Sequence, residues 1–313
     1  MNSRFFIFTL LLPLFCWAAS SKVFELLPVE DELVDSIAIS ILQQNYAVAE
    51  RQGARLFSIN PQAGANFWAL AKLANYNDLG DTNKVYEAKL LLDTLEFSKE
   101  EWEGLRLFQV GFIEGLLGNG MRAATRTRAA AKIFKPLDNS EAQAFYFIYA
   151  FYMEALSAWI PGVSDKRPEM LIELEKITHN SVRFGSVIGS ATVWMYFGRK
   201  EYDKALNLVD ALLKKSPQNP AFLQMRADML FRLEEYDAAA EIYEKSATYY
   251  ERKAPKSLRW WCAAGNLARI YQENDKKELS QRWIDHFSSP EFQKIKKWMP
   301  PSLMKDLKRR KLL

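Results

Sequence analysis

Apolar residues recur along this chain at intervals of three and four positions, with polar residues between them. This spacing places the apolar side chains on one face of a helix. No segment after the first twenty residues alternates strictly between apolar and polar positions, as a half-buried strand would. Glycine and proline stand between the periodic segments and do not form long linkers. The pattern therefore predicts an all-α chain.

A short motif repeats within this helical pattern. Tyr202-Asp203-Lys204-Ala205 recurs 34 residues later as Tyr236-Asp237-Ala238-Ala239, and Tyr46-Ala47-Val48-Ala49 has the same Tyr-x-x-Ala form. A period of this length is typical of solenoids built from stacked helix pairs. One pair cannot bury its apolar face alone, so neighbouring pairs must stack against each other.

With small residues such as Gly111 and Ala227 at the expected helix crossings, the motif resembles the tetratricopeptide repeat. The resemblance covers most of residues 30–287 in about seven helix pairs, and the units near 30–63, 186–219 and 220–253 match best. It implies a superhelical solenoid with a concave inner face that binds partners. Departures from the period predict three irregular features: a stretched loop from Asn75 to Asn83, a distorted turn at Pro161-Gly162 and an insertion around 249–255. The motifs Ser98-x-x-Glu101 and Ser140-x-x-Gln143 predict capping boxes at the starts of two helices.

The first twenty residues have the organisation of a secretory signal peptide. Arg4 precedes the apolar run Phe5 to Phe15, and small residues follow between Ala18 and Ser21. An N-terminal membrane anchor is the alternative. We expect an exported protein, periplasmic or extracellular, in which Cys262 is left as a single cysteine without an intrachain disulfide.

The expected domains are a signal peptide at 1–20, a solenoid at 21–287 and a basic C-terminal segment at 288–313. Residues 291–313 contain eight Lys or Arg residues against Glu291 and Asp306. This segment is either a helix that caps the solenoid or an amphipathic contact for an anionic membrane surface. We favour the cap, and nucleic acid is not an expected partner of an exported protein.

No catalytic signature accompanies the repeats. The two histidines, His179 and His286, are far apart in sequence, and no phosphate-binding glycine loop or His-Glu-x-x-His motif occurs. We therefore expect neither an enzyme nor a cofactor or metal, although an active site assembled only in three dimensions stays open. The aromatic run 145–152 predicts a core helix, with a transmembrane helix as the weaker alternative.

The resemblance also implies which residues face the groove. In the family, one stripe of each first helix points into the concave surface, where aromatic and charged side chains suit a peptide or a partner helix. Carried over to this sequence, the stripe consists of Trp68, Lys72, Phe147, Phe151, Trp194, Phe197, Gln224, Asp228, Arg232 and Arg269. We expect a non-catalytic scaffold or adaptor of the cell envelope that binds a protein or peptide partner there. The alternative is an accessory subunit of an envelope transport or assembly machine that docks through the basic tail.

Overall fold

The computed structural model describes residues 24–157, 164–181 and 185–313, and every regular element in these ranges is a helix. The all-α prediction is therefore confirmed for the described residues. The expected signal peptide and the Pro161-Gly162 turn lie outside them. The helices form two compact units, which are described separately.

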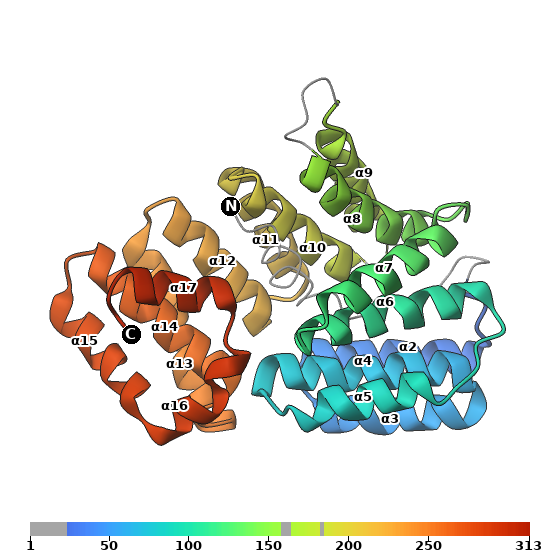
Figure 1. Cartoon of the computed structure of the whole chain (residues 1–313), viewed down its shortest axis with the longest axis horizontal. Coiled ribbons are helices and arrows are strands. Elements are labelled where there is room, and N and C mark those ends of the chain that lie inside the picture. Colours follow the sequence, from blue (N-terminus) through green and yellow to red (C-terminus); the bar gives the residue numbers. More distant parts are fainter. Residues whose placement is uncertain (1–23, 158–163, 182–184) are drawn as a thin grey trace. The chain divides into compact units, whose positions relative to one another are not determined.

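The first unit comprises the described residues up to Asn75 and from Thr82 to Met195. Its helices are α2 (Pro28–Leu42), α3 (Tyr46–Ile59), most of α4 (Pro61–Leu79), α5 (Asn83–Asp93), α6 (Glu100–Leu116), α7 (Gly120–Phe134), α8 (Ser140–Ser157), α9 (Arg167–Asn180) and most of α10 (Gly185–Gly198). Helices that follow each other in the chain pack together, as the contacts of α6 with α7 and of α7 with α8 show (Figure 1).

The second unit comprises Tyr76–Asp81 and the chain from Tyr196 to the C-terminus. Its helices are α11 (Tyr202–Lys215), α12 (Pro220–Arg232), α13 (Tyr236–Lys253), α14 (Leu258–Glu273), α15 (Lys277–Asp285), α16 (Pro290–Ile295) and α17 (Pro301–Arg309), with short 3₁₀ helices η2 (His286–Ser288) and η3 (Lys296–Trp298). Consecutive helices from α11 to α15 pack against each other, and α17 lies on α14 (Figure 1). Within each unit, the consecutive helices thus follow the expected succession of paired helices.

The repeat is also visible in the turns inside the pairs. Five turns contain one residue with positive φ, always two positions before the second helix begins; these residues are Gln44, Gly118, Lys200, Glu234 and Asp275. In each turn the next amide donates to the carbonyl five residues earlier, which is the Schellman arrangement. Four of the five residues are not glycine, although the left-handed conformation costs about 1 kcal/mol for such residues. The packing of each pair therefore imposes the turn.

Small residues allow the helices of a pair to cross closely, as the repeat pattern predicts. A Cβ atom at Gly111 of α6 would lie 2.6 Å from Thr127 Cγ2 on α7. In the second unit, Ala227, Ala239 and Ala263 are fully buried in one cluster that joins α12, α13 and α14. The alanines admit the larger side chains of that cluster, of which Tyr243 is 1% exposed.

Two of the expected irregularities have a different form in the structure. The predicted stretched loop is mostly helical, since α4 continues to Leu79 and the turn is confined to the residues around Gly80. The expected insertion around 249–255 lengthens α13 to 18 residues.

Both predicted capping boxes are wrong. Ser98 lies before α6 and is instead held by Gln62, whose Nε2 donates to Ser98 Oγ at 2.8 Å. At the start of α8, Asn139 Oδ1 accepts the amides of Glu141 and Ala142 at 3.0 Å. An Asn one residue earlier reaches these free amides, so Ser140 is not needed as the cap.

Candidate partner-binding site

Two side chains with catalytic potential, His286 and Cys262, are held in packed positions. No group of three His, Cys, Asp or Glu side chains in the described ranges could hold a metal ion. His286 is packed between the rings of Trp260 and Trp283, whose centroids lie 5.1 and 5.9 Å away. Cys262 is buried, and this burial raises the pKa of its thiol to about 12. A thiol with such a pKa is a poor nucleophile at neutral pH.

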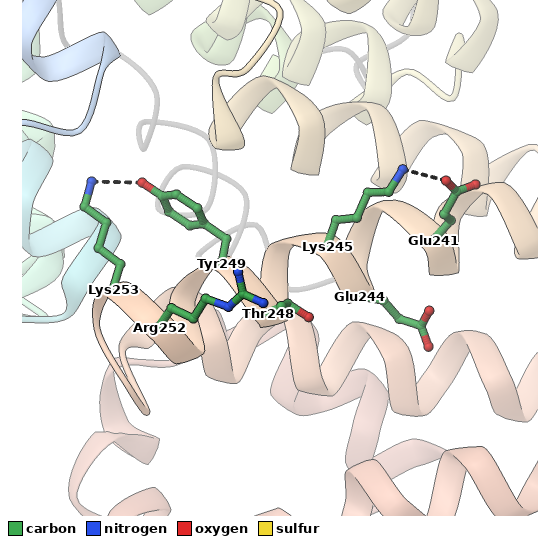
Figure 2. Close-up of a pocket in the computed structure, with 7 residues that line it drawn as sticks. All are labelled: Glu241, Glu244, Lys245, Thr248, Tyr249, Arg252 and Lys253. Carbon is green, nitrogen blue, oxygen red and sulfur yellow. Dashed lines mark hydrogen bonds and ion pairs between the residues drawn. The ribbon is translucent and has the colours of Figure 1, made fainter.

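One surface hollow lies on α13, and Figure 2 shows that a single helix supplies its lining. The seven lining residues, Glu241, Glu244, Lys245, Thr248, Tyr249, Arg252 and Lys253, all belong to this helix. Several of their polar groups pair with each other, for example Lys245 with Glu241. A ligand pocket normally encloses its ligand between several elements. We therefore do not assign the candidate site to this hollow.

The helices of the described ranges also include no candidate membrane span. This holds for α8, which contains the aromatic run. Phe145, Ile148 and Phe151 of that helix are buried, and Phe145 stacks on Phe134 of α7 with ring centroids 5.3 Å apart.

In the first unit, the structure places Trp68 and Lys72 of α4 against the helices directly before and after it, α3 and α5. Trp68 packs edge-on to Phe57 of α3. Lys72 Nζ lies 3.1 Å from Glu50 of α3 and 2.5 Å from Glu87 of α5. The Lys72 side chain is only 9% exposed, so its charge is engaged within the unit.

The three remaining predicted residues of the first unit differ in exposure. Phe151 is buried with Arg167 of α9 over its ring, whereas Phe147 and Trp194 are half-buried. Phe147 and Phe151 lie on α8 and Trp194 on α10, whereas Trp68 and Lys72 lie on α4.

In the second unit, four predicted residues lie close together. The guanidinium of Arg232 lies over the rings of Phe197 and Phe231, at 5.3 and 5.7 Å from their centroids. The guanidinium of Arg269 also lies over the ring of Phe231, 4.3 Å from its centroid. Arg269 Nη2 also donates to Asp228 Oδ1 at 3.1 Å. Such cation–π contacts contribute most where water is excluded.

We call the stripe of Gln224, Asp228 and Arg232 on α12 together with Gly265 and Arg269 on α14 the α12/α14 face. These residues are spaced by four along each helix, so each set lies on one side of its helix. Gln224 Oε1 accepts a hydrogen bond from Arg259 Nη1 at 3.0 Å.

Within this face, the surroundings of Asp228 shift its pKa. Burial raises the pKa of the Asp228 carboxyl, and Arg269 opposes that rise. Asp228 therefore sits in a poorly hydrated position and depends on Arg269 for compensation.

The α14 side of the α12/α14 face is covered by α17. A Cβ atom at Gly265 would lie 3.2 Å from Leu307 Cδ1 and 3.3 Å from Leu303 Cδ2. Arg269 Nη1 lies 3.6 Å from Asp306 Oδ2, and Arg310 pairs with Glu273 at the end of α14. Arg269 therefore stands between a carboxylate of α12 and a carboxylate of α17.

Sequence reasoning missed Asp306, Arg310 and Glu273 as parts of this cluster. The signal was the single acid among the cations of 301–311, one position before Leu307 of a leucine pair. This pattern marks a helix with one specific carboxylate. It does not identify Arg269, which is 37 residues earlier in the chain, as the partner of that carboxylate.

The basic tail is packed against the second unit. Phe292 and Met299 are buried, and Phe292 lies against Trp261 with ring centroids 5.1 Å apart. Arg309 and Arg310 both pair with Asp306. The apolar stripe of the tail is therefore used for packing, which fits the capping role that we favoured.

A stronger cationic surface lies on α7, which sequence analysis did not single out. Its exposed cations are Arg122, Arg126, Arg128, Lys132 and, just after the helix, Lys135. No Asp or Glu occurs between Glu114 and Asp138. These five cations form no ion pair within the described part of the chain, although Lys135 lies over the ring of Tyr146.

Comparisons with known proteins identify no family by sequence. No protein-family model matches the chain, and no curated protein matches it. Among solved structures, the chain is similar to the crystal structure of a tetratricopeptide repeat protein from Parabacteroides merdae, with 14% identity and a TM-score of 0.42. The match covers 82% of this chain and 91% of that one.

Proposed function

We propose that this protein is a non-catalytic interaction scaffold and that the α12/α14 face of its second unit binds a partner helix. The observation that carries the proposal is the convergence of Phe197, Asp228, Arg232 and Arg269 at one place. Arginine and aromatic side chains together make the strongest contributions at protein interfaces. Two neighbouring helices with a glycine between the charged groups also leave a groove that accepts a third helix.

The proposal includes an exported location, periplasmic or extracellular, which rests on the sequence of residues 1–20. Within it, the protein is an adaptor of the cell envelope or an accessory subunit of an envelope machine. No cofactor is required for either role, since recognition uses side chains of the chain itself.

A photo-crosslinking amino acid placed at Arg232 tests the proposal in the native envelope. Arg232 is exposed at the rim of the α12/α14 face, so a partner seated there lies within reach. The same amino acid at Lys245, whose side chain is 73% exposed on α13, is the matched control. A defined protein adduct at position 232 that is absent at 245 supports the proposal. Equal adducts at both positions, or no adduct at position 232 either in the full chain or in a variant that ends before α17, contradict it.

A second candidate function is docking to an anionic surface, and α7 favours it. Five exposed cations without acidic neighbours create a positive ridge along one helix. Each Lys or Arg near an anionic membrane adds about 1 kcal/mol of attraction, so such a ridge can hold a protein at the surface. In this candidate function, α7 and not the C-terminal tail makes the main contact with the anionic surface.

Vesicle co-sedimentation distinguishes these two contacts. The intact chain should bind vesicles that contain phosphatidylglycerol and be released by salt. Replacing Arg122, Arg126 and Arg128 by Gln should abolish binding, whereas replacing Lys305, Lys308 and Lys311 by Gln should reduce it only slightly. The opposite ranking would return the membrane contact to the tail.

A further inference from the structure

The α12/α14 face has an occupant that belongs to the chain itself. We infer that α17 is an internal ligand of this face, and that the external partner is a helix with the pattern Leu-x-x-Asp-Leu-x-x-Arg that replaces it. In α17 this pattern consists of Leu303, Asp306, Leu307 and Arg310. The inference rests on the proposed function, since it assigns a partner chemistry to the same face.

The apolar half of the pattern is set by Gly265. The three heavy atoms nearest to a Cβ built on Gly265 are all methyl carbons of Leu303 and Leu307, at 3.2 to 3.6 Å. The two leucines are four residues apart and therefore lie on the same side of α17. Both are buried, with Leu307 fully enclosed and Leu303 7% exposed. The glycine thus provides a notch that fits a pair of leucines one turn apart.

The charged half sets the direction of the bound helix. Along α14, the cation Arg269 comes one turn before the anion Glu273, and along α17 the anion Asp306 comes one turn before the cation Arg310. Asp306 meets Arg269 and Arg310 meets Glu273, so the two helices run in the same direction. A helix that ran the other way would bring like charges together. The face is therefore selective for polarity as well as for side chains.

The face does not depend on α17 for its construction. Ala263, Leu267 and Ile270, on the opposite stripe of α14, belong to the core cluster that α12 and α13 share. The glycine notch and the ion pairs of α17, by contrast, all fall on the Gly265–Glu273 side of α14. The contacts of α17 lie on this one stripe, so α17 can leave while the opposite stripe of α14 stays packed on α12 and α13.

The charges of the face are not fully matched by α17. Arg269 Nε is buried and donates no hydrogen bond to any side chain or carbonyl in the described part of the protein. Burial lowers the pKa of Arg310, and the positive charges of Arg269 and Arg232 lower it further. Arg232 itself forms no ion pair within the described residues and lies over the rings of Phe197 and Phe231. A partner helix with a further carboxylate opposite Arg232 would therefore bind more tightly than α17 does.

A labelled peptide of residues 300–313 tests this inference directly. Fluorescence anisotropy should show binding to a variant that ends at Met299, and at least roughly tenfold weaker binding to the full chain. A peptide with Leu303→Ala and Leu307→Ala, or with Asp306→Lys, should not bind. Gly265→Leu in the shortened variant should abolish binding, because its side chain fills the notch. Absence of binding to a folded shortened variant, or equal binding to the Gly265→Leu variant, overturns the inference.

Hydrogen exchange of α13 to α15 controls for folding. If the shortened variant loses protection there, the full chain with Leu303→Ala and Leu307→Ala replaces it as the open form. Loss of protection in this variant too would show that α17 is part of the core and would overturn the inference. A full chain that dimerises through α17 would likewise overturn it, since a second copy would then be the occupant.

The crosslinking experiment at Arg232 separates this inference from the proposed function. A partner captured more efficiently by the open form supports both. A partner captured equally by the open form and by the full chain leaves the interaction scaffold standing and removes the role of α17 as a competitor.

Discussion

Each unit of this protein has a nearly buried cation between two carboxylates, and the two clusters are closed in different ways. In the first unit, Lys72 is held by Glu50 and Glu87 from the helices directly before and after its own. In the second unit, Arg269 is held by Asp228 of α12 and by Asp306 of α17. The first cluster is built within consecutive repeats, whereas the second receives one of its charges from the chain terminus.

This difference indicates what each cluster can do. Both carboxylates that hold Lys72 come from the helices next to its own in the chain, so its cluster serves the fold. Arg269 can lose Asp306 by departure of one terminal helix and still keep Asp228. A buried ion pair contributes little net stability, but an unpaired buried charge is strongly unfavourable. The second cluster is therefore suited to exchange one carboxylate for another.

The largest effect is expected from Lys72→Ala. The substitution leaves Glu50 and Glu87 facing each other with only Lys84 to compensate them, and should destabilise the first unit by about 3 kcal/mol. Urea denaturation, with hydrogen exchange of α3 to α5 to locate the loss, measures it. Lys204→Ala is the matched control, because its pair with Glu201 is exposed and should contribute less than about 1 kcal/mol. Equal losses for the two variants would show that the Lys72 cluster has no structural role.

Next in size is the contrast between two fully buried leucines of the second unit. Leu267→Ala should lower the protection of α12 to α14 together by about 3 kcal/mol, because Leu267 lies in their common core. Leu307→Ala should reduce protection of α17 by about 2 kcal/mol and leave α13 and α14 unchanged. Hydrogen exchange resolved by segment compares them. If Leu307→Ala also opens α13 and α14, then α17 is a structural part of the unit.

The helix pairs could be predicted because short-range sequence patterns determine them. The 34-residue interval and the small residues at Gly111 and Ala227 are visible in the sequence, and the structure contains the corresponding helix pairs. The shared turn geometry was not predictable, since Gln44, Lys200 and Glu234 are not typical residues for positive φ. The packing of the two helices, and not the turn residue, determines that conformation.

Only one part of the candidate site, the stripe of residues on α12 and α14, could be predicted from the sequence. The stripe of Asp228, Arg232 and Arg269 follows from helical spacing, and these residues do converge. Their cover could not be deduced, because the docking of α17 on α14 is a tertiary contact outside the repeat. The same limit applies to Lys72, whose carboxylate partners are 22 and 15 residues away and carry no motif.

Acid should change the contributions of the two clusters to stability in opposite directions. The contribution of Glu87 should be less than about 1 kcal/mol, because this residue is partly exposed. The hydrogen bond from Lys72 lowers the pKa of Glu87 below its usual 4.5, so its contribution is present above pH 4.5 and is lost as pH falls through its folded pKa. Burial raises the pKa of Asp228 above its usual 3.8, so its ionisation opposes folding as pH rises through its folded pKa.

Urea titrations at several pH values between neutral and 3.5 test this contrast. Glu87→Gln should remove part of the acid sensitivity of the first unit. Asp228→Asn should remove the loss of second-unit stability that accompanies a rise of pH through the folded pKa of Asp228. If both variants change the pH dependence of the free energy of unfolding in the same direction, burial does not dominate the pKa of Asp228.

The smallest effect on stability is expected on α7, whose arginines form no ion pair within the described residues. Arg122→Gln with Arg126→Gln removes no ion pair of the described structure, so the free energy of unfolding should change by less than about 0.5 kcal/mol. The change could be slightly stabilising, because Arg122 stands in the first turn of α7, where the helix dipole disfavours a cation. Thermal denaturation of the variant beside the wild type measures the effect. Lys89→Gln, which removes the pairs with Asp93 and Glu114, is the control and should destabilise the first unit more. A loss at α7 as large as that of the control would show that its arginines serve the fold, and would leave no cationic ridge free for an anionic surface.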